Sequence, residues 1–460
     1  MTLRSWIPAA SASQVVAFAG GALTNLLYAR MMPLSSVGKL AILTAVASFI
    51  VLLADGGLQL LSAREIASGK ASRQAAAARL LWTIPVLVVV ITGLVALAGA
   101  FVGRVSIGGA GNAALLLELA AAVALFQIAL TLTLGSAEFR RRARLIAVNG
   151  ILTACFTAAA LAFRPSVAMA VHATVAAYAI IALLELKRDR TAVTNPPPLP
   201  VLRAALREAR PLWANSGVTF VTASADVLLA GLLFPLAVVG QYQIFKKLAV
   251  VALSPLTTLL PPLFAHLSAL TARERIRTLV RLQRFAAALV GVTLALVGPL
   301  LHPLVRATAG SAYDNRSYLF VVLIGIGALQ FTHNFLGYAL TAAGRFWRPL
   351  AINSVVAVSG LGGALAGGAM FGLKGFVGGL ALANASGVVV GALLMNDRGG
   401  EPFFRGLAAS VAAFVLPALF TLATLGKAPA ITAPLSMVIA LAVATTLLVS
   451  RSTVLRVRPR

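Results

Sequence analysis

Long uninterrupted apolar runs constrain this chain more than any other feature. Hydrophobic residues make up 60% of its 460 residues and charged residues only 11%, which leaves too little polar surface for a water-soluble domain. Apolar runs longer than about 18 residues are typical of transmembrane helices. Because these runs are continuous rather than alternating, the sequence predicts an all-α polytopic membrane protein and disfavours a membrane β-barrel.

Fourteen such runs predict about fourteen transmembrane helices. They lie at residues 8–30, 38–61, 80–103, 113–134, 145–163, 167–186, 212–234, 240–260, 285–305, 318–342, 349–371, 375–395, 406–425 and 430–450. If the N-terminus is cytoplasmic, the connections on that side hold 28 Lys or Arg residues and those on the other side hold 8. This positive-inside bias predicts that both termini are cytoplasmic.

The connection after the sixth run predicts a division into domains. Three consecutive prolines at 196–198 cannot continue a helix, and residues 201–210 then resume as a short amphipathic helix with arginines on one side. We therefore expect an N-terminal six-helix lobe at 1–195, a cytoplasmic linker at 196–211, a second six-helix lobe at 212–396, and two additional helices with a basic tail at 397–460.

Two short repeated segments indicate that the chain contains two copies of one structural unit. Residues 33–38 (PLSSVG) recur as 235–240 (PLAVVG), an offset of 202, and residues 144–149 (RLIAVN) recur as 348–353 (RPLAIN), an offset of 204. Six predicted spans separate the copies, so the two copies share one orientation. The symmetry axis is therefore expected to run along the membrane normal.

Glycines recur at four-residue spacing in the eleventh and twelfth spans. Small residues at this spacing let helices approach closely, either within one chain or across a dimer interface. The pairs are Gly363 and Gly367, Gly368 and Gly372, Gly375 and Gly379, and Gly387 and Gly391.

Ionisable side chains at membrane depth are costly and are therefore functional candidates. Asp55 precedes two glycines that favour a local helix break, which suggests a hinge or cation site; the alternative is a packing role in which Asp55 pairs with a basic residue such as Arg64. Asp226 is the deepest acid and is a candidate for substrate or cation handling. His333 is a candidate proton relay, with a hydrogen-bonded packing role as the alternative. We group Asp55, Arg64 and His333 as gating or ion-coupling candidates.

The basic candidates are Arg30 at the outer end of the first span and the adjacent Lys246 and Lys247 within the eighth. Neighbouring helical residues point about 100° apart, so one lysine of the pair is expected to face the bundle interior. A fixed cation in a cavity suits a phosphate group or an acidic sugar. We therefore group Arg30, Lys246, Lys247 and Asp226 as substrate-binding candidates.

Several function classes are excluded or disfavoured. The net charge of +26 lies between apolar runs and is not interleaved with aromatics, which argues for anionic membrane lipids rather than nucleic acid as its partner. Cys155 alone forms neither a disulfide nor a cysteine metal site. No P-loop, G-x-S-x-G or H-E-x-x-H motif occurs, so we expect no enzyme activity, cofactor or metal.

Three segments resemble bacterial polysaccharide exporters, the lipid-linked oligosaccharide and O-antigen flippases of the multidrug/oligosaccharidyl-lipid/polysaccharide exporter superfamily. The likeness covers roughly residues 10–395. It rests on Arg30, Pro33, Val37-Gly38, Asp55-Gly56-Gly57-Leu58 and Arg64-Glu65-Ile66-Ala67; on Val239-Gly240-Gln241-Tyr242-Gln243-Ile244-Phe245-Lys246-Lys247-Leu248; and on Thr341-Ala342-Ala343-Gly344-Arg345.

This resemblance implies two six-helix lobes around a cavity that opens alternately to each side of the bacterial inner membrane. The implied substrate is a polyprenyl-diphosphate-linked saccharide, and glycosyltransferases and a polymerase of the same pathway are implied partners. Thr257 and Thr258 stand where Asp55-Gly56 would repeat, so a symmetric site is not expected. Fourteen spans exceed the twelve common among these flippases and are typical of the related lipid II flippases. The alternatives are a lipid II-type flippase, a multidrug or cation antiporter, a membrane glycosyltransferase and a non-transporting scaffold.

Overall fold

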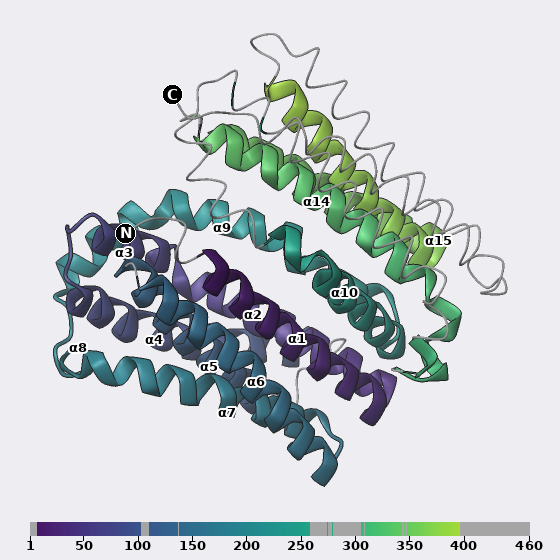
Figure 1. The fold of residues 1–460 in the computed structure, drawn as a ribbon, viewed down its shortest axis with the longest axis horizontal. Coiled ribbons are helices and arrows are strands. Elements are labelled where there is room, and N and C mark those ends of the chain that lie inside the picture. Colours follow the sequence, from purple (N-terminus) through teal and green to yellow (C-terminus); the bar gives the residue numbers. More distant parts are fainter. Residues whose placement is uncertain are drawn as a thin grey trace. The chain divides into compact units, whose positions relative to one another are not determined.

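The computed structural model describes residues 7–102, 110–136, 138–257, 305–307, 309–342 and 347–395, together with the single residues 274, 278 and 345. This part of the chain is helical and contains no β-strand. In the numbering of Figure 1, its helices are α1 (Ile7–Met31), α2 (Leu34–Asp55), α3 (Leu58–Ala67), α4 (Arg73–Val102), α5 (Ala110–Gly135), α6 (Phe139–Phe163), α7 (Val167–Leu186), η2 (Lys187–Asp189), α8 (Arg190–Thr194), α9 (Leu199–Leu233), α10 (Leu236–Thr257), η3 (Ser311–Arg316), α14 (Tyr318–Ala342) and α15 (Trp347–Met395).

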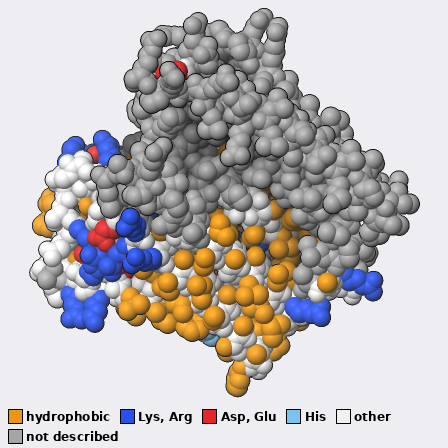
Figure 2. Space-filling view, in the orientation of Figure 1, with side chains coloured by type: hydrophobic (Ala, Val, Ile, Leu, Met, Phe, Trp, Pro, Cys, Tyr) orange, Lys and Arg blue, Asp and Glu red, His pale blue; other side chains and the backbone are white. Residues whose placement is uncertain are grey.

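Among the described residues, eight helices are long and apolar enough to cross a membrane, or nine if the two segments of α9 form one span. Hydrophobic side chains cover a broad area of the described surface, with lysines and arginines at its margins (Figure 2). The predicted class, an all-α polytopic membrane protein, is confirmed. The spans expected at 285–305, 406–425 and 430–450, and the region 397–460, lie outside the described residues, so the number fourteen stays a prediction.

The chain divides into two compact units, Met1–Gln243 and Ile244–Arg460. In the first unit, α1 packs along α6, while α5 packs against α2, α3, α4 and α7 (Figure 1). In the second unit, α14 packs against α15. The described helices of each unit therefore pack against one another within that unit.

The second apolar run forms two helices rather than one span at 38–61. Gly56 and Gly57 have φ angles of 54° and 79°, both in the left-handed region that glycine adopts without a Cβ penalty. Gly56 caps the end of α2, and Gly57 is the N-cap of α3. The break that the two glycines predicted is therefore confirmed.

α9 joins the predicted linker to the predicted seventh span. It starts at Leu199 with Pro200 in its first turn, where a missing N–H is tolerated. The amphipathic segment at 201–210 is the first part of this helix rather than a separate helix. Further along, α9 bends by 51° between Leu212–Thr222 and Ser224–Leu233.

The first part of α9 packs on the break between α2 and α3. A Cβ added to Gly57 would lie 2.7 Å from the carbonyl oxygen of Ala209 and 2.8 Å from the amide nitrogen of Trp213. Leu206 lies beside Gly56 in the same contact. Ala205 and Ala209 are buried, whereas Arg203 and other arginines of this segment are exposed. The apolar side of the linker segment thus covers the glycine break.

The repeated PLxxVG segments adopt the same structure. Pro33 and Pro235 each precede a helix, and their carbonyl oxygens accept hydrogen bonds from the third and fourth residues that follow, at 2.9–3.2 Å. Their glycines also meet: a Cβ on Gly38 would collide with the carbonyl of Leu236, and a Cβ on Gly240 would collide with the carbonyl of Leu34. This reciprocal contact explains why both copies end in glycine.

α15 contains the predicted eleventh and twelfth spans, which meet at a kink where Gly372 has φ 60° and ψ −148°. Across this kink, Gly363 faces the backbone of Gly379 and Gly367 faces that of Gly375. The glycine spacing therefore serves packing within one chain, the first of the two interpretations that the sequence left open.

Candidate functional site

Asp55 caps the helix that follows the glycine break. Its carboxylate accepts hydrogen bonds from the backbone N–H groups of Gly57, at 3.1 Å, and Gln59, at 2.9 Å. A carboxylate is favoured there because the first N–H groups of a helix have no intrahelical partner and the dipole is positive. The sequence placed Asp55 beside backbone groups released by the glycines, and the structure shows the bonds that it makes with them.

Arg64 does not pair with Asp55. Its side chain is on the exposed side of α3, and the described part of the chain shows no ion pair between the two. The neighbouring Glu65 instead forms a close ion pair with Arg79 of α4, whose side chain is largely buried and also donates to Ser62. The described structure therefore does not contain an Asp55–Arg64 ion pair, and a packing or gating role for either residue stays a prediction.

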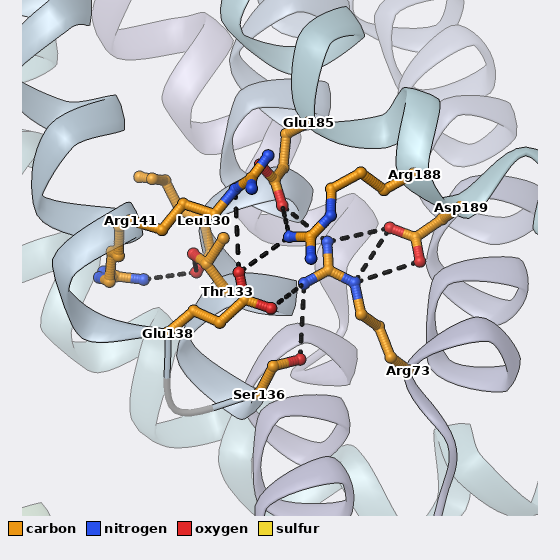
Figure 3. Close-up of polar contacts among 10 residues, drawn as sticks. Arg73, Leu130, Thr133, Ser136, Glu138, Arg141, Glu185, Arg188 and Asp189 are labelled. Atoms are coloured by element: carbon orange, nitrogen blue, oxygen red, sulfur yellow. Dashed lines mark hydrogen bonds and ion pairs between the residues drawn. The ribbon is translucent and has the colours of Figure 1, made fainter. Parts of the chain in front are cut away.

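An arginine–carboxylate network joins the start of α4, the α5–α6 connection and the end of α7 (Figure 3). It consists of Arg73, Glu138, Arg141, Glu185, Arg188 and Asp189. Arg73 lies at its centre and donates to Asp189 through Nε, at 3.1 and 3.2 Å, and through Nη2, at 3.0 Å. Nη2 also donates to Glu185 at 2.7 Å.

The remaining ion pairs close the network. Arg141 contacts the fully buried Glu185 at 2.6 Å, and Arg188 contacts Glu138 at 2.8 Å. Three arginines thus face three carboxylates, which leaves no net charge to attract a ligand. We interpret the network as structural, because it ties together helix ends that come from separate parts of the sequence.

Glu138 is the network carboxylate that lies between spans, and its pKa is shifted. Partial burial acts to raise the pKa, but the hydrogen bond from Arg188 and the charges of Arg188, Arg73 and Arg141 outweigh it. The pKa of Glu138 is therefore held below its ordinary value of 4.5.

This shift predicts a pH-dependent stability. Since the folded-state pKa is the lower one, the ion pairs stabilise the protein above the unfolded-state pKa, and this stabilisation is lost as pH falls through the folded-state pKa. Thermal unfolding in detergent should show the unfolding temperature of the wild type falling more steeply than that of Glu138→Gln as pH drops from about 5 towards 3. Parallel pH profiles for the two proteins would contradict this prediction.

Asp226 is buried in α9, as its position in the sequence suggested. Its side chain has 8% relative exposure and accepts a short hydrogen bond from the hydroxyl of Tyr242 in α10. The structure therefore brings Asp226 to a neutral donor, and its role with substrate or cation stays a prediction.

The basic candidates fall in different units. Arg30 is exposed in the last turn of α1. In α10, Lys246 is half-buried and Lys247 is exposed. The two lysines therefore do lie in different environments, as the 100° step between neighbours requires. A substrate role for these residues stays a prediction.

His333 is buried between α14 and α15. Its Nε2 lies 3.1 Å from Oδ1 of Asn384, whose own amide donates to the carbonyl of Leu380. Nδ1 of His333 has no hydrogen-bond partner among the residues that the structure describes. Gly387 leaves room for the ring, because a Cβ there would lie 3.4 Å from Cγ of His333. The bond to Asn384 is of the kind that the packing alternative for His333 requires. A proton-relay role for His333 stays a prediction.

The sequence alone did not predict two groups of functional or structural residues. The arginine–carboxylate network was missed, although the spacing of Glu185, Arg188 and Asp189 at a helix end is a signal that such residues share one face. The uncharged Gln59 and Gln127 were also missed, because only ionisable side chains were weighed at membrane depth. A carboxamide within an apolar run is itself a signal, since lipid offers it no partner.

The fold is similar to that of several solved membrane transporters. A lipid II flippase MurJ in an inward closed conformation matches with a TM-score of 0.70 and 11% identity, over 97% of this chain and 98% of that chain. An inward-facing multidrug resistance MATE family transporter matches with a TM-score of 0.62 and 14% identity, over 87% of this chain and 95% of that chain. A MOP superfamily transporter from Pyrococcus furiosus matches with a TM-score of 0.55 and 16% identity, over 88% of this chain and 96% of that chain. At sequence identities this low, the structural similarity is evidence about the fold alone.

The profile of a family described as polysaccharide biosynthesis protein matches residues 4–268, more than half of the chain. The protein therefore belongs to this family, and the resemblance noted from its sequence motifs is confirmed. No curated protein sequence matches the chain.

Proposed function

We propose that the protein is an alternating-access transporter that moves a polyprenyl-diphosphate-linked oligosaccharide or polysaccharide precursor across the bacterial inner membrane. Both termini are cytoplasmic in this proposal, and glycosyltransferases and a polymerase of the same pathway supply and consume the substrate. The family match and the shared transporter fold support transport of a saccharide precursor.

One observation carries the choice of an anionic substrate. Each acidic side chain within the described spans already has an internal partner. Asp55 caps α3, Glu118 pairs with His172, Glu185 lies in the arginine–carboxylate network, and Asp226 accepts from Tyr242. Among the basic candidates, Arg30 and Lys247 are exposed to surroundings that a substrate could reach. A cationic drug would need available carboxylates, so the arrangement favours a diphosphate over the multidrug or cation antiporter alternative.

The double substitution Lys246→Ala with Lys247→Ala tests this proposal. We expect it to abolish surface polysaccharide in cells whose membranes still contain the protein, because the diphosphate loses its point charges. Removing two exposed lysines outside this pair, Lys70→Ala with Lys374→Ala, is the control for loss of positive charge and should preserve export. Normal polysaccharide in the Lys246/Lys247 double variant would overturn the assigned role.

The likeness to a lipid II flippase supports a second candidate, a lipid II-type precursor. Both substrates carry a diphosphate, so the lysine variants do not separate them. Translocation assays in proteoliposomes with each purified lipid do: the substrate is the lipid whose sugar becomes accessible on the opposite side.

A further inference from the structure

Two carboxamide side chains meet where α3 packs against α5. Nε2 of Gln59 in α3 lies 3.5 Å from Oε1 of Gln127 in α5. Thr131, one turn beyond Gln127, donates its hydroxyl to Oε1 of Gln59 at 3.0 Å. Neither carboxamide is bonded to a charged side chain. The three residues therefore form a neutral hydrogen-bonding group, which we call the carboxamide cluster.

The cluster lies at membrane depth and is accessible. Gln127 is exposed, and it belongs to a span that runs from Gly111 to Gly135. It precedes the end of this span by eight residues, or about 12 Å at 1.5 Å per residue. Lipid tails have no hydrogen-bond acceptors, so an exposed carboxamide at this depth is costly unless it meets water or a polar ligand.

The hydrogen-bonding capacity of Gln127 is only partly used. Its Oε1 accepts from Gln59, whereas its two Nε2–H groups donate to no acceptor within the described part of the chain. A carboxamide has no net charge, so a phosphate would be bound better by arginine or lysine. Donors and acceptors without charge instead match the hydroxyl groups of a neutral sugar.

Gln59 is held in place through both its backbone and its side chain. The backbone N–H of Gln59 donates to Asp55, and its side-chain oxygen accepts from Thr131. Asp55 therefore orients the first turn of α3, and with it the side chain that contacts Gln127. Fixed orientation lowers the entropy that ligand binding must offset.

We propose that the carboxamide cluster is a subsite for the hydroxyl groups of a neutral sugar, with Gln127 as the residue that contacts the ligand and Gln59, Thr131 and Asp55 as positioning residues. This inference rests on the proposed transport of a lipid-linked saccharide and adds the place where the sugar is recognised. The proposed function assigns the diphosphate to the basic residues and not to this neutral cluster.

Binding of two matched probes tests the subsite. The full-length protein in detergent is titrated with a polyprenyl diphosphate and with the same lipid bearing a single neutral hexose. The wild type should bind the sugar-bearing lipid more tightly. One or two neutral hydrogen bonds correspond to about 3- to 10-fold in affinity, so this preference should disappear in Gln127→Ala while affinity for the bare diphosphate is unchanged.

Two further variants make the result interpretable. Gln74→Ala removes another exposed glutamine, at the start of α4, and should keep the sugar preference. Gln127→Met keeps side-chain length without hydrogen-bonding groups, so it should behave like Gln127→Ala and replaces it if that variant unfolds.

The outcomes separate this inference from the proposed function. If the wild type binds neither lipid, the proposed function fails. If it binds both lipids equally, or if Gln127→Ala and Gln127→Met keep the sugar preference, the carboxamide cluster is not a sugar subsite and the proposed function stands.

Discussion

Replacing Arg73 by alanine should lower the free energy of unfolding by about 3–5 kcal/mol, the usual effect of removing one partner of a buried ion pair. Asp189 is the reason. Its side chain is 3% exposed, and Arg73 is the cation that contacts it in the described structure. Without Arg73, the Asp189 carboxylate is left buried without a counter-charge. Unfolding of the purified protein in mixed detergent micelles measures the change.

Two variants control this experiment. Arg64→Ala removes an exposed arginine that forms no ion pair with the described residues, and it should change stability by no more than about 0.5 kcal/mol. Adding Asp189→Asn to Arg73→Ala should recover part of the loss, because the uncompensated charge is removed. An Arg73→Ala variant as stable as Arg64→Ala would show that the network adds nothing to stability.

Replacing Gly57 by alanine should destabilise the protein by about 2–5 kcal/mol, from left-handed backbone strain and overpacking together. Its φ of 79° is unfavourable for any residue with a Cβ. The added Cβ would also meet the backbone of α9 at Ala209 and Trp213, which cannot move as a flexible side chain can. The same unfolding measurement applies.

Two other glycines separate these causes. Gly69 has φ 71° with nothing within 4 Å of an added Cβ, so Gly69→Ala should cost only the strain, about 1–2 kcal/mol. Gly93 is helical and equally open, so Gly93→Ala should be stabilising by up to about 1 kcal/mol. Equal effects at Gly57 and Gly69 would mean that the α9 contact does not constrain the break.

The glycine break links the two proposals about function. Asp55 and the left-handed glycines end α2 and set the start of α3, and α3 carries Gln59 into the carboxamide cluster. The linker segment of α9 covers the same break. A loss of sugar preference in Gly57→Ala would therefore be expected alongside its loss of stability.

Local features of the fold were predictable because they depend on residues close together in the chain. Continuous apolar runs require internally bonded helices in lipid, whatever their neighbours are. Gly56 and Gly57 predicted the break that the structure shows, because their φ angles are a local property. The repeated turns at Pro33 and Pro235 likewise follow from proline geometry.

Contacts between distant residues were not predictable in this way. Arg73 meets Asp189 across 116 positions, and Gln59 meets Gln127 across 68. Only helix packing decides which of many polar residues become neighbours. Asp55 does not pair with Arg64 in the described structure, because its carboxylate accepts from the N–H groups of Gly57 and Gln59 while Arg64 lies on the exposed side of α3.

The sequence by itself determined the helical membrane class, the positions of most described spans, the glycine break and the exporter family, because each depends on composition, short-range backbone geometry or motif. Only the tertiary structure decided that α9 packs on the break, that the acids within the described spans are internally bonded, and that Gln127 remains exposed with unused donors. Burial and hydrogen-bond partners are set by which helix faces meet, and lipid-facing and protein-facing helix sides are similarly apolar.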